Sequence, residues 1–194
     1  YRHGDDSLSI STAAGERIRI DSVGRVGLNE TGMSAYDGNA DDLVIKTGGN
    51  TGITVRTSST GTGSIFFADG ISGAERYQGT IRYFHNGNVM TFGTSATERM
   101  RINSNGNIGI NYTSAAPHAL TVKGTISRLN SSGIQILNLG SNGEHGQLTV
   151  NNSGGVTRVA LNSSGADSYI SAGNFGIGVT NPASKLEVGG SFRI

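Results

Sequence analysis

One short pattern occurs twice in this chain and constrains its fold more than any other feature. Residues 16–29 read ERIRIDSVGRVGLN, and residues 98–111 read ERMRINSNGNIGIN. A third start, GNFGIGVTNP, begins at Gly173. The spacing, the charges and the glycines nearly match between the copies. We therefore interpret the chain as a series of related structural modules.

Within each copy, apolar and polar residues alternate, which predicts a β-strand with two different faces. Ile18 and Ile20 share one face of the first copy, while Arg17, Arg19 and Asp21 point to the other face. The second copy repeats this arrangement with Met100 and Ile102. We expect the glutamates at the start of each copy and the arginines beside them to form ion pairs between strands or between chains.

A turn follows the first strand of each copy. In the second copy, Asn105-Gly106 predicts a type I′ turn, in which both central residues have positive φ. Val23-Gly24 takes this place in the first copy and is a poorer match. Gly27 and Gly109 then interrupt the next short strand, which indicates that another backbone segment approaches closely. Each copy is therefore predicted to be a short hairpin with one thin apolar face and a notch on the other.

The middle of the chain predicts a small β-meander. The segments SIFFADG, GTIRYFHNGN and VMTFGT lie between Ser64 and Thr94, and Asp-Gly and Asn-Gly turns separate them. Half of the chain's Phe and Tyr residues lie in this region. We expect most of these aromatic side chains to form the core of the meander.

One face of this meander is the candidate recognition surface. Alternation places Ile81 and Tyr83 on one face and Arg82 and Phe84 on the other. One of the two faces has to be partly exposed or shared between chains, and exposed aromatic rings can stack on sugars. The candidate receptor-contact residues are Arg82, Phe84, His85 and Asn86.

The composition supports an ordered β-rich chain with a thin core. Of 194 residues, 31 are Gly and 2 are Pro, and 15% are charged, well below the roughly 25% of a typical domain. A net charge of +1 and recurring Val, Ile and Thr argue against disorder. Chains short of core often gain burial by oligomerising.

Several classes of partner are not indicated by the sequence. The arginines are scattered without a basic stripe, so we expect no nucleic-acid partner. No apolar stretch is long enough to span a bilayer, so we expect no membrane insertion.

No motif predicts catalysis, a cofactor or a metal site. The chain contains no GxSxG elbow, Walker loop or GxGxxG fingerprint, and its four histidines lack metal-ligand spacing. Nothing fixes the separation of any two carboxylates among Asp69, Glu75, Glu144 and Asp167, as polysaccharide cleavage would require. We expect no enzymatic activity, although a catalytic pair assembled across chains would be invisible in sequence.

The segment DGNADD is the one stretch with partial calcium-loop spacing. Asp37, Asn39 and Asp41 occupy positions one, three and five of such a loop. Position six is Asp42 rather than Gly, and position twelve is Gly48 rather than Glu. We interpret the segment as a polar turn stabilised by Asx side chains.

With the repeats laid out, a resemblance to a known family emerges. Residues 173–190, GNFGIGVTNPASKLEVGG, resemble the G-N-[VI]-G-I-G-T-x-x-P-x-x-K-L-x-V-x-G element of bacteriophage tail-fibre and tailspike proteins. Residues 95–124 resemble an earlier copy, and residues 63–94 are similar to the stretch that commonly precedes it. Asn111-Tyr112 and His118-Ala119 depart from the family pattern, and the first copy lacks the Pro-x-x-Lys-Leu part.

The resemblance implies an all-β, elongated and intertwined homotrimeric fibre with short hairpin repeats and a small β-meander. In the family, an intramolecular-chaperone domain often follows the last element, helps three chains to assemble and cleaves itself off. The resemblance places the start of such a domain close to Ile194. The expected modules are a first hairpin repeat at 1–32, the meander at 33–94, a second repeat at 95–124, and a C-terminal β module at 125–194.

The expected function is that of a structural and adhesive segment of a phage tail fibre in the virion. Thin apolar faces gain most when three chains pool them, and glycine notches would allow close approach between chains. The expected partners are two further copies, other tail proteins, and a host-surface glycan or protein. Two alternatives stay open, namely a fragment of a polysaccharide-depolymerising tailspike and a bacterial surface adhesin with the same repeats.

Overall fold

The structure, a computed structural model, describes residues 6–13, 15–142, 145–163, 167–171 and 173–190. Its regular elements are β-strands and two short 3₁₀ helices, so the all-β class predicted from the alternating pattern is confirmed. The chain divides into two compact units, Tyr1–Arg56 and Thr57–Ile194. The strands belong to four separate sheets, one in the first unit and three in the second.

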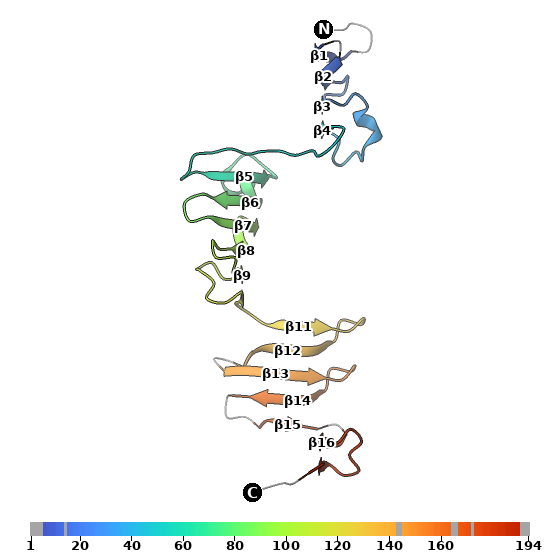
Figure 1. Ribbon diagram of the computed structural model, residues 1–194, viewed down its shortest axis with the longest axis vertical. Coiled ribbons are helices and arrows are strands. Elements are labelled where there is room, and N and C mark those ends of the chain that lie inside the picture. Colours follow the sequence, from blue (N-terminus) through green and yellow to red (C-terminus); the bar gives the residue numbers. More distant parts are fainter. Residues whose placement is uncertain (1–5, 14, 143–144, 164–166, 172, 191–194) are drawn as a thin grey trace. The chain divides into compact units, whose positions relative to one another are not determined.

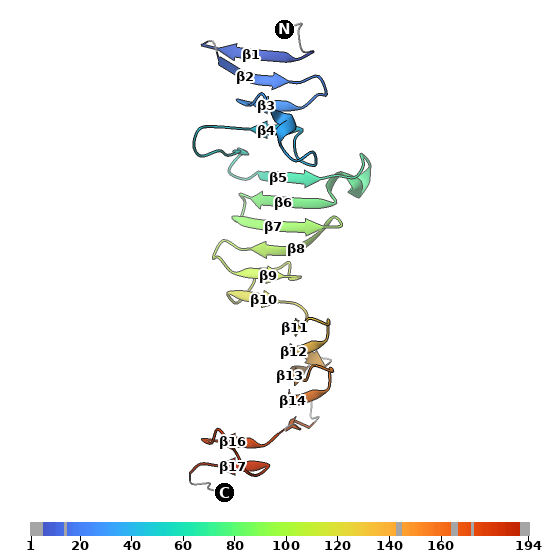
Figure 2. The same ribbon diagram turned by 90° about the vertical axis from the view of Figure 1, so that its right-hand side faces the viewer.

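The first unit contains a four-stranded sheet with its strands in chain order (Figure 2). The first three strands are antiparallel, and the fourth runs parallel to the third. A 3₁₀ helix, η1 (Met33–Ala35), lies in the connection between the two parallel strands. The four strands are β1 (Leu8–Thr12), β2 (Gly15–Ile20), β3 (Val26–Leu28) and β4 (Leu43–Ile45).

The second unit begins with a six-stranded sheet that contains the predicted meander (Figure 2). All three predicted meander strands are present, as β5, β6 and β7, with a 3₁₀ helix η2 (Gly73–Tyr77) between the first two. The strands are β5 (Thr62–Phe67), β6 (Gly79–Phe84), β7 (Val89–Thr94), β8 (Thr97–Ile102), β9 (Ile108–Ile110) and β10 (Leu120–Val122).

The meander and the second repeat are parts of this one sheet. Ser95 and Ala96 have φ values of 52° and 55° and form a two-residue hairpin between β7 and β8. Positive φ at both central residues matches a type I′ turn, here without Gly or Asn. The module boundary expected at residue 94 therefore lies at a tight turn within a continuous sheet.

Two further sheets complete the second unit. Figure 1 shows β11 to β14 in chain order within a five-stranded antiparallel sheet. The last sheet pairs two short parallel strands. Residues 191–194, which follow the last strand, lie outside the described part. The strands are β11 (Ile126–Leu129), β12 (Gln135–Asn142), β13 (His145–Asn151), β14 (Thr157–Asn162), β15 (Tyr169–Ile170), β16 (Phe175–Ile177) and β17 (Leu186–Val188).

The sequence repeats correspond to one repeated backbone arrangement. In both full copies an antiparallel strand pairs with a three-residue strand, whose central glycine lies opposite an arginine: Arg19 opposite Gly27, and Arg101 opposite Gly109. A parallel strand then closes the module, as β4, β10 and β17. The first copy has this strand although it lacks the Pro-x-x-Lys-Leu sequence. The connection at residues 111–119 is shorter than the dozen residues usual for a parallel crossover, because it passes over strands of only three residues.

The predicted type I′ turn at Asn105-Gly106 is wrong in its type. The Asn103 N–H donates to the Asn107 carbonyl, so three residues lie in the loop, and Gly106 alone has positive φ, at 82°. This is the hairpin in which a type I turn is followed by one left-handed residue. Gly24, with φ 94°, closes the same loop in the first copy. Val23 is therefore compatible with its position, because only the glycine after it needs positive φ.

The chain has a very thin core. Among the described residues, the buried apolar side chains are Met33, Val44, Ala116 and Ala160. The expectation that the meander aromatics form a core is wrong for several of them, since Phe66 and Phe67 are 49% and 59% exposed, and Tyr83 is also exposed. A single layer of strands cannot cover its own faces, so side chains on both faces stay partly exposed.

Candidate functional site

The four-stranded and six-stranded sheets each align most of their apolar side chains on one face. Strand register places these residues directly opposite each other from strand to strand, in two columns that run across the strands. In the first sheet the columns are Leu8–Ile20–Val26–Leu43 and Ile10–Ile18–Leu28–Ile45. In the six-stranded sheet the matching columns are Met90–Ile102–Ile108–Leu120 and Phe92–Met100–Ile110–Val122.

These apolar faces are open in the single chain. Leu43 is 54% exposed and Leu120 is 55% exposed, at equivalent ends of the two modules. Ile65, which continues one column onto β5, is likewise half-exposed. Contiguous exposed apolar surface of this kind marks sites of interaction with another protein surface. The same face that the alternation predicted is thus available for assembly.

The opposite face carries the notch predicted from the interior glycines, and the chain's own loop fills it. A Cβ atom on Gly109 would lie 2.7 Å from the Tyr112 carbonyl oxygen. The carbonyl of Glu30 crowds Gly27 and the carbonyl of Val179 crowds Gly176 in the same way. The close backbone approach is therefore confirmed, but the approaching segment belongs to the same chain. These three glycines need no second chain to explain them.

The residue that leaves each glycine strand adopts a left-handed conformation. It is Asn29 in the first copy, Asn111 in the second and Gly178 in the third, with φ of 60°, 51° and 71°. Each asparagine amide donates to a main-chain carbonyl, at Lys46 and Lys123 respectively, over 3.2 Å. Asparagine tolerates this conformation better than most residues. Asn111 therefore has the same left-handed conformation as Gly178, which occupies this position in the third copy.

The repeated glutamate and arginine form the same ion pair in both copies. The Arg101 Nε and Nη2 groups donate to the two Glu98 oxygens at 2.6 and 3.0 Å, and Arg19 binds Glu16 with nearly identical distances. The hydrogen bond that Arg101 donates to Glu98 raises the pKa of Arg101. The expectation of pairs between strands is wrong, since both partners lie on one strand. A register shift at Phe92/Gly93 marks a β-bulge that brings them to the same side.

A side chain two residues before each glycine ties the following loop to the sheet. Asn107 donates to the Ala116 carbonyl at 2.8 Å, and Asn174 donates to the Pro182 carbonyl at 2.7 Å. Arg25 takes this position in the first copy and bridges the Asp21 and Asp41 carboxylates. The bond is an amide hydrogen bond in two copies and an ion pair in the first. In each copy it fixes the loop next to the glycine-containing strand.

Glu30 fixes the long loop of the first module. Its Oε1 accepts the N–H groups of Thr31 and Gly32 at 2.8 and 2.9 Å. Its Oε2 accepts the Tyr36 hydroxyl and pairs with Lys46, both at 2.9 Å. The Gly32 N–H and the Lys46 ammonium are the leading causes that lower the pKa of Glu30 to about 2. The charged form of this carboxylate therefore stabilises the folded loop.

The DGNADD segment has the geometry of an Asx turn. Asp37 Oδ1 accepts both the N–H and the side-chain amide of Asn39, at 3.0 and 2.9 Å. These hydrogen bonds lower the pKa of Asp37. Asp41 is buried and bound to Arg25. Among the described residues, no group of three His, Cys, Asp or Glu side chains is arranged to hold a metal ion.

The four candidate contact residues lie at one end of β6 but on two different sides. Arg82 stacks on Phe66 and Tyr77, two aromatic residues that sequence analysis did not connect with it. His85 contacts Tyr83 edge to face, with ring centroids 5.0 Å apart. Asn86 is exposed in the turn, and Phe84 is half-buried. The structure therefore groups Arg82 with two rings from neighbouring elements rather than with His85.

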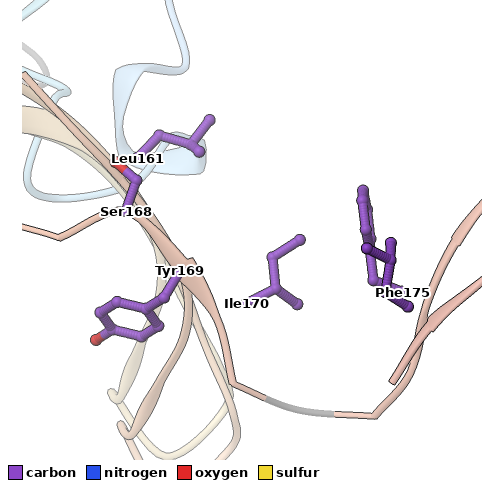
Figure 3. A pocket seen from close by; sticks show the side chains of 6 residues that line it. Leu161, Ser168, Tyr169, Ile170 and Phe175 are labelled. Carbon is purple, nitrogen blue, oxygen red and sulfur yellow. The ribbon is translucent and has the colours of Figure 1, made fainter. Parts of the chain in front are cut away.

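Two hollows lie along the apolar faces. One has a volume of about 320 Å³ and includes Tyr83, Met90 and Asn103 in its lining. The Asn103 Nδ2 group is buried and has no hydrogen-bond partner among the described residues. The other hollow has a volume of about 360 Å³ and is lined by residues of β14 to β17. Figure 3 shows Leu161, Ile170 and Phe175 around it.

Of the carboxylates considered for catalysis, Glu75 has a structural role. Its side chain accepts the Ser72 N–H at 3.2 Å and completes a capping box at η2. Glu144 lies outside the described residues. No helix in the described part of the chain has the length and apolar character needed to cross a membrane.

A comparison with protein-family models and with curated protein sequences finds no match to this chain. The function proposed below therefore rests on the fold, on the arrangement of its surfaces and on the resemblance that residues 63–124 and 173–190 carry.

Proposed function

We propose that this chain is a structural and adhesive segment of a bacteriophage tail fibre, assembled as a homotrimer and involved in attachment to the host-cell surface. The observation that carries the proposal is the repeated module with its aligned, half-exposed apolar columns. Two modules in different units present the same columns in the same register. A chain built by repeating such a unit is suited to extension along a fibre.

The number of chains follows from the resemblance, and physical chemistry supports association. Burial of apolar surface stabilises an assembly by roughly 25 cal/mol per Å². The single chain leaves most of its large apolar side chains partly exposed to solvent. Three copies around one axis would turn these faces toward each other and would also shield strand edges. On the opposite face, the chain's own loops already cover the interior glycines. That face would therefore point away from the axis of the assembly.

Attachment is tested with the intact chain and bacterial cells. Labelled protein is incubated with a panel of strains, and retention after washing is measured. We expect saturable retention on some strains and competition by unlabelled protein. A trimer that is retained by none of the strains would support a purely structural segment and contradict the adhesive part of the proposal. Release of new reducing ends from the surface polysaccharide would instead favour a depolymerase.

A further inference from the structure

The Arg82 side chain has an unusual environment for a half-buried arginine. Its Cζ atom lies 4.8 Å from the Phe66 ring centroid and 5.7 Å from that of Tyr77. Among the described residues, it has no hydrogen bond or ion pair, and its Nε is buried without a partner. Arg101 and Arg25, which are also partly buried, both bind carboxylates. Buried polar groups are normally paired, so Arg82 differs from these two arginines.

The position of Arg82 in the sheet keeps it away from the apolar columns. Register pairs Arg82 with Ser64 and Thr91, and pairs Phe66 with Thr80. These residues alternate with Ile81, so they occupy the face opposite the apolar one. Phe66 is about half exposed on that face. Assembly through the apolar columns would therefore leave the Arg82 cluster, defined as Arg82, Phe66 and Tyr77, accessible.

Two acidic side chains of the elements around Arg82 have partners of their own. Glu98, on the same sheet, binds Arg101 with both oxygens. Glu75, in the helix that carries Tyr77, accepts the Ser72 N–H. A guanidinium stacked on aromatic rings keeps its charge and its planar N–H edge, which matches a carboxylate in two-point contact. Phe66, which the guanidinium contacts, is about half exposed, so its ring can also offer apolar surface to a ligand.

We propose that the Arg82 cluster binds a carboxylate-bearing sugar of the host-surface glycan, with the carboxylate on the Arg82 guanidinium and the C–H face of the sugar ring on Phe66. This inference rests on the proposed attachment function and specifies its ligand class. A charged group opposite Arg82 would supply the counter-ion that the described residues do not provide. The aromatic surface favours a sugar ring over a small inorganic anion.

The test is calorimetric titration of the intact chain with oligosaccharides that carry galacturonate, glucuronate or sialic acid, next to their neutral counterparts and inorganic phosphate. We expect at least one acidic oligosaccharide to bind at least tenfold more tightly than its neutral counterpart and than phosphate. Arg82→Gln should weaken this binding at least tenfold. Arg82→Lys, which keeps the charge but loses the planar fork, should give an intermediate loss.

The matched control is Arg128→Gln, which removes the same charge from an exposed position on β11. It should leave binding unchanged, and melting temperatures of all variants should show that they fold. Equal loss in Arg82→Gln and Arg128→Gln, or no preference for any acidic oligosaccharide, would overturn the inference. Cell retention separates the two proposals, because wild-type protein that adheres to cells without acidic-sugar preference overturns only the ligand assignment, whereas a chain that adheres to no strain contradicts the attachment function.

Discussion

The carbonyl oxygen of Tyr112 lies 2.7 Å from the point where a Cβ atom on Gly109 would be placed. The loop that follows β9 folds back over the strand at this point, and any side chain at residue 109 would push it away. The corresponding glycines of the other two copies are crowded by the carbonyl three residues later in the same way. The repeated glycine is thus required by the module itself.

Gly109→Ala should lower the stability of the second unit. Overpacking at a tight contact typically costs about 1–3 kcal/mol, and the atom that the new Cβ would meet is a backbone oxygen rather than the end of a flexible side chain. The matched control is Gly146→Ala on β13, where the nearest atom to a new Cβ is 3.7 Å away. Urea unfolding followed by circular dichroism measures both variants. Equal stability of the two variants would show that the close approach is not a constraint.

Asn111 is expected to be needed for its backbone conformation more than for its side chain. Asn111→Gly keeps the left-handed conformation available and loses one hydrogen bond to the Lys123 carbonyl. Asn111→Ala loses the same bond and also has to adopt a conformation that costs an L-residue about 1–2 kcal/mol. We expect wild type and Asn111→Gly to unfold at higher denaturant concentration than Asn111→Ala. The reverse order would contradict the assigned conformation.

Glu30 should make the stability of the first unit sensitive to acid. Its folded pKa is about 2, below the unfolded value of about 4.3. The stabilisation is therefore complete above about pH 4.3 and is lost as the pH falls toward 2. The difference in melting temperature between wild type and Glu30→Gln should be large at pH 7 and small near pH 2.

The control for this pH dependence is Asp42→Asn, which removes one exposed carboxylate from the same loop. Scanning calorimetry at several pH values compares the three proteins. A difference between wild type and Glu30→Gln that stays constant from pH 7 to pH 2 would refute the role of the charged form.

Ile65→Asp should disrupt assembly without unfolding the sheet. Ile65 is 49% exposed in the single chain, and substitutions at such surface positions usually change the stability of an isolated chain by no more than about 0.5 kcal/mol. In an assembly through the apolar face, the new carboxylate would be buried against other chains and would weaken their association strongly. Ser64→Asp, on the opposite face of the same strand, is the control and should assemble normally. Light scattering at graded concentrations distinguishes these outcomes.

Alternation predicted which residues share a face, because the side-chain period of a strand is fixed. It could not show that Glu98 and Arg101 meet on one strand, because the bulge that brings them together depends on pairing with β7. The closing strand β4 was also missed, since its parallel pairing with β3 depends on a folded loop without a sequence signature. Both features are set by tertiary contacts.

A signal for the hairpin loops was present in the sequence but was interpreted as the wrong turn type. Four hairpins share an Asp or Asn followed three residues later by a glycine with positive φ. In three of them the first side chain accepts main-chain N–H groups within the loop. The loops are Asp21–Gly24, Asn103–Gly106, Asn130–Gly133 and Asn152–Gly155. The recurring spacing, rather than the Asn-Gly pair alone, predicts the three-residue loop.

Sites that depend on several elements were beyond sequence reasoning. Arg82 was selected because it lies on one face of β6, but its contacts with Phe66 and Tyr77 come from β5 and η2. No spacing in the sequence brings these three residues together. The same holds for the hollow beside Tyr83, which combines residues of three strands with residues of two turns.

The most direct test of the assembly is sedimentation equilibrium of the intact chain at several concentrations near neutral pH. The chain has a mass of 20.0 kDa, and we expect a single species with three times that mass. A monodisperse monomer over the same concentration range would contradict the proposal that the open apolar faces are the assembly surface of a trimeric fibre.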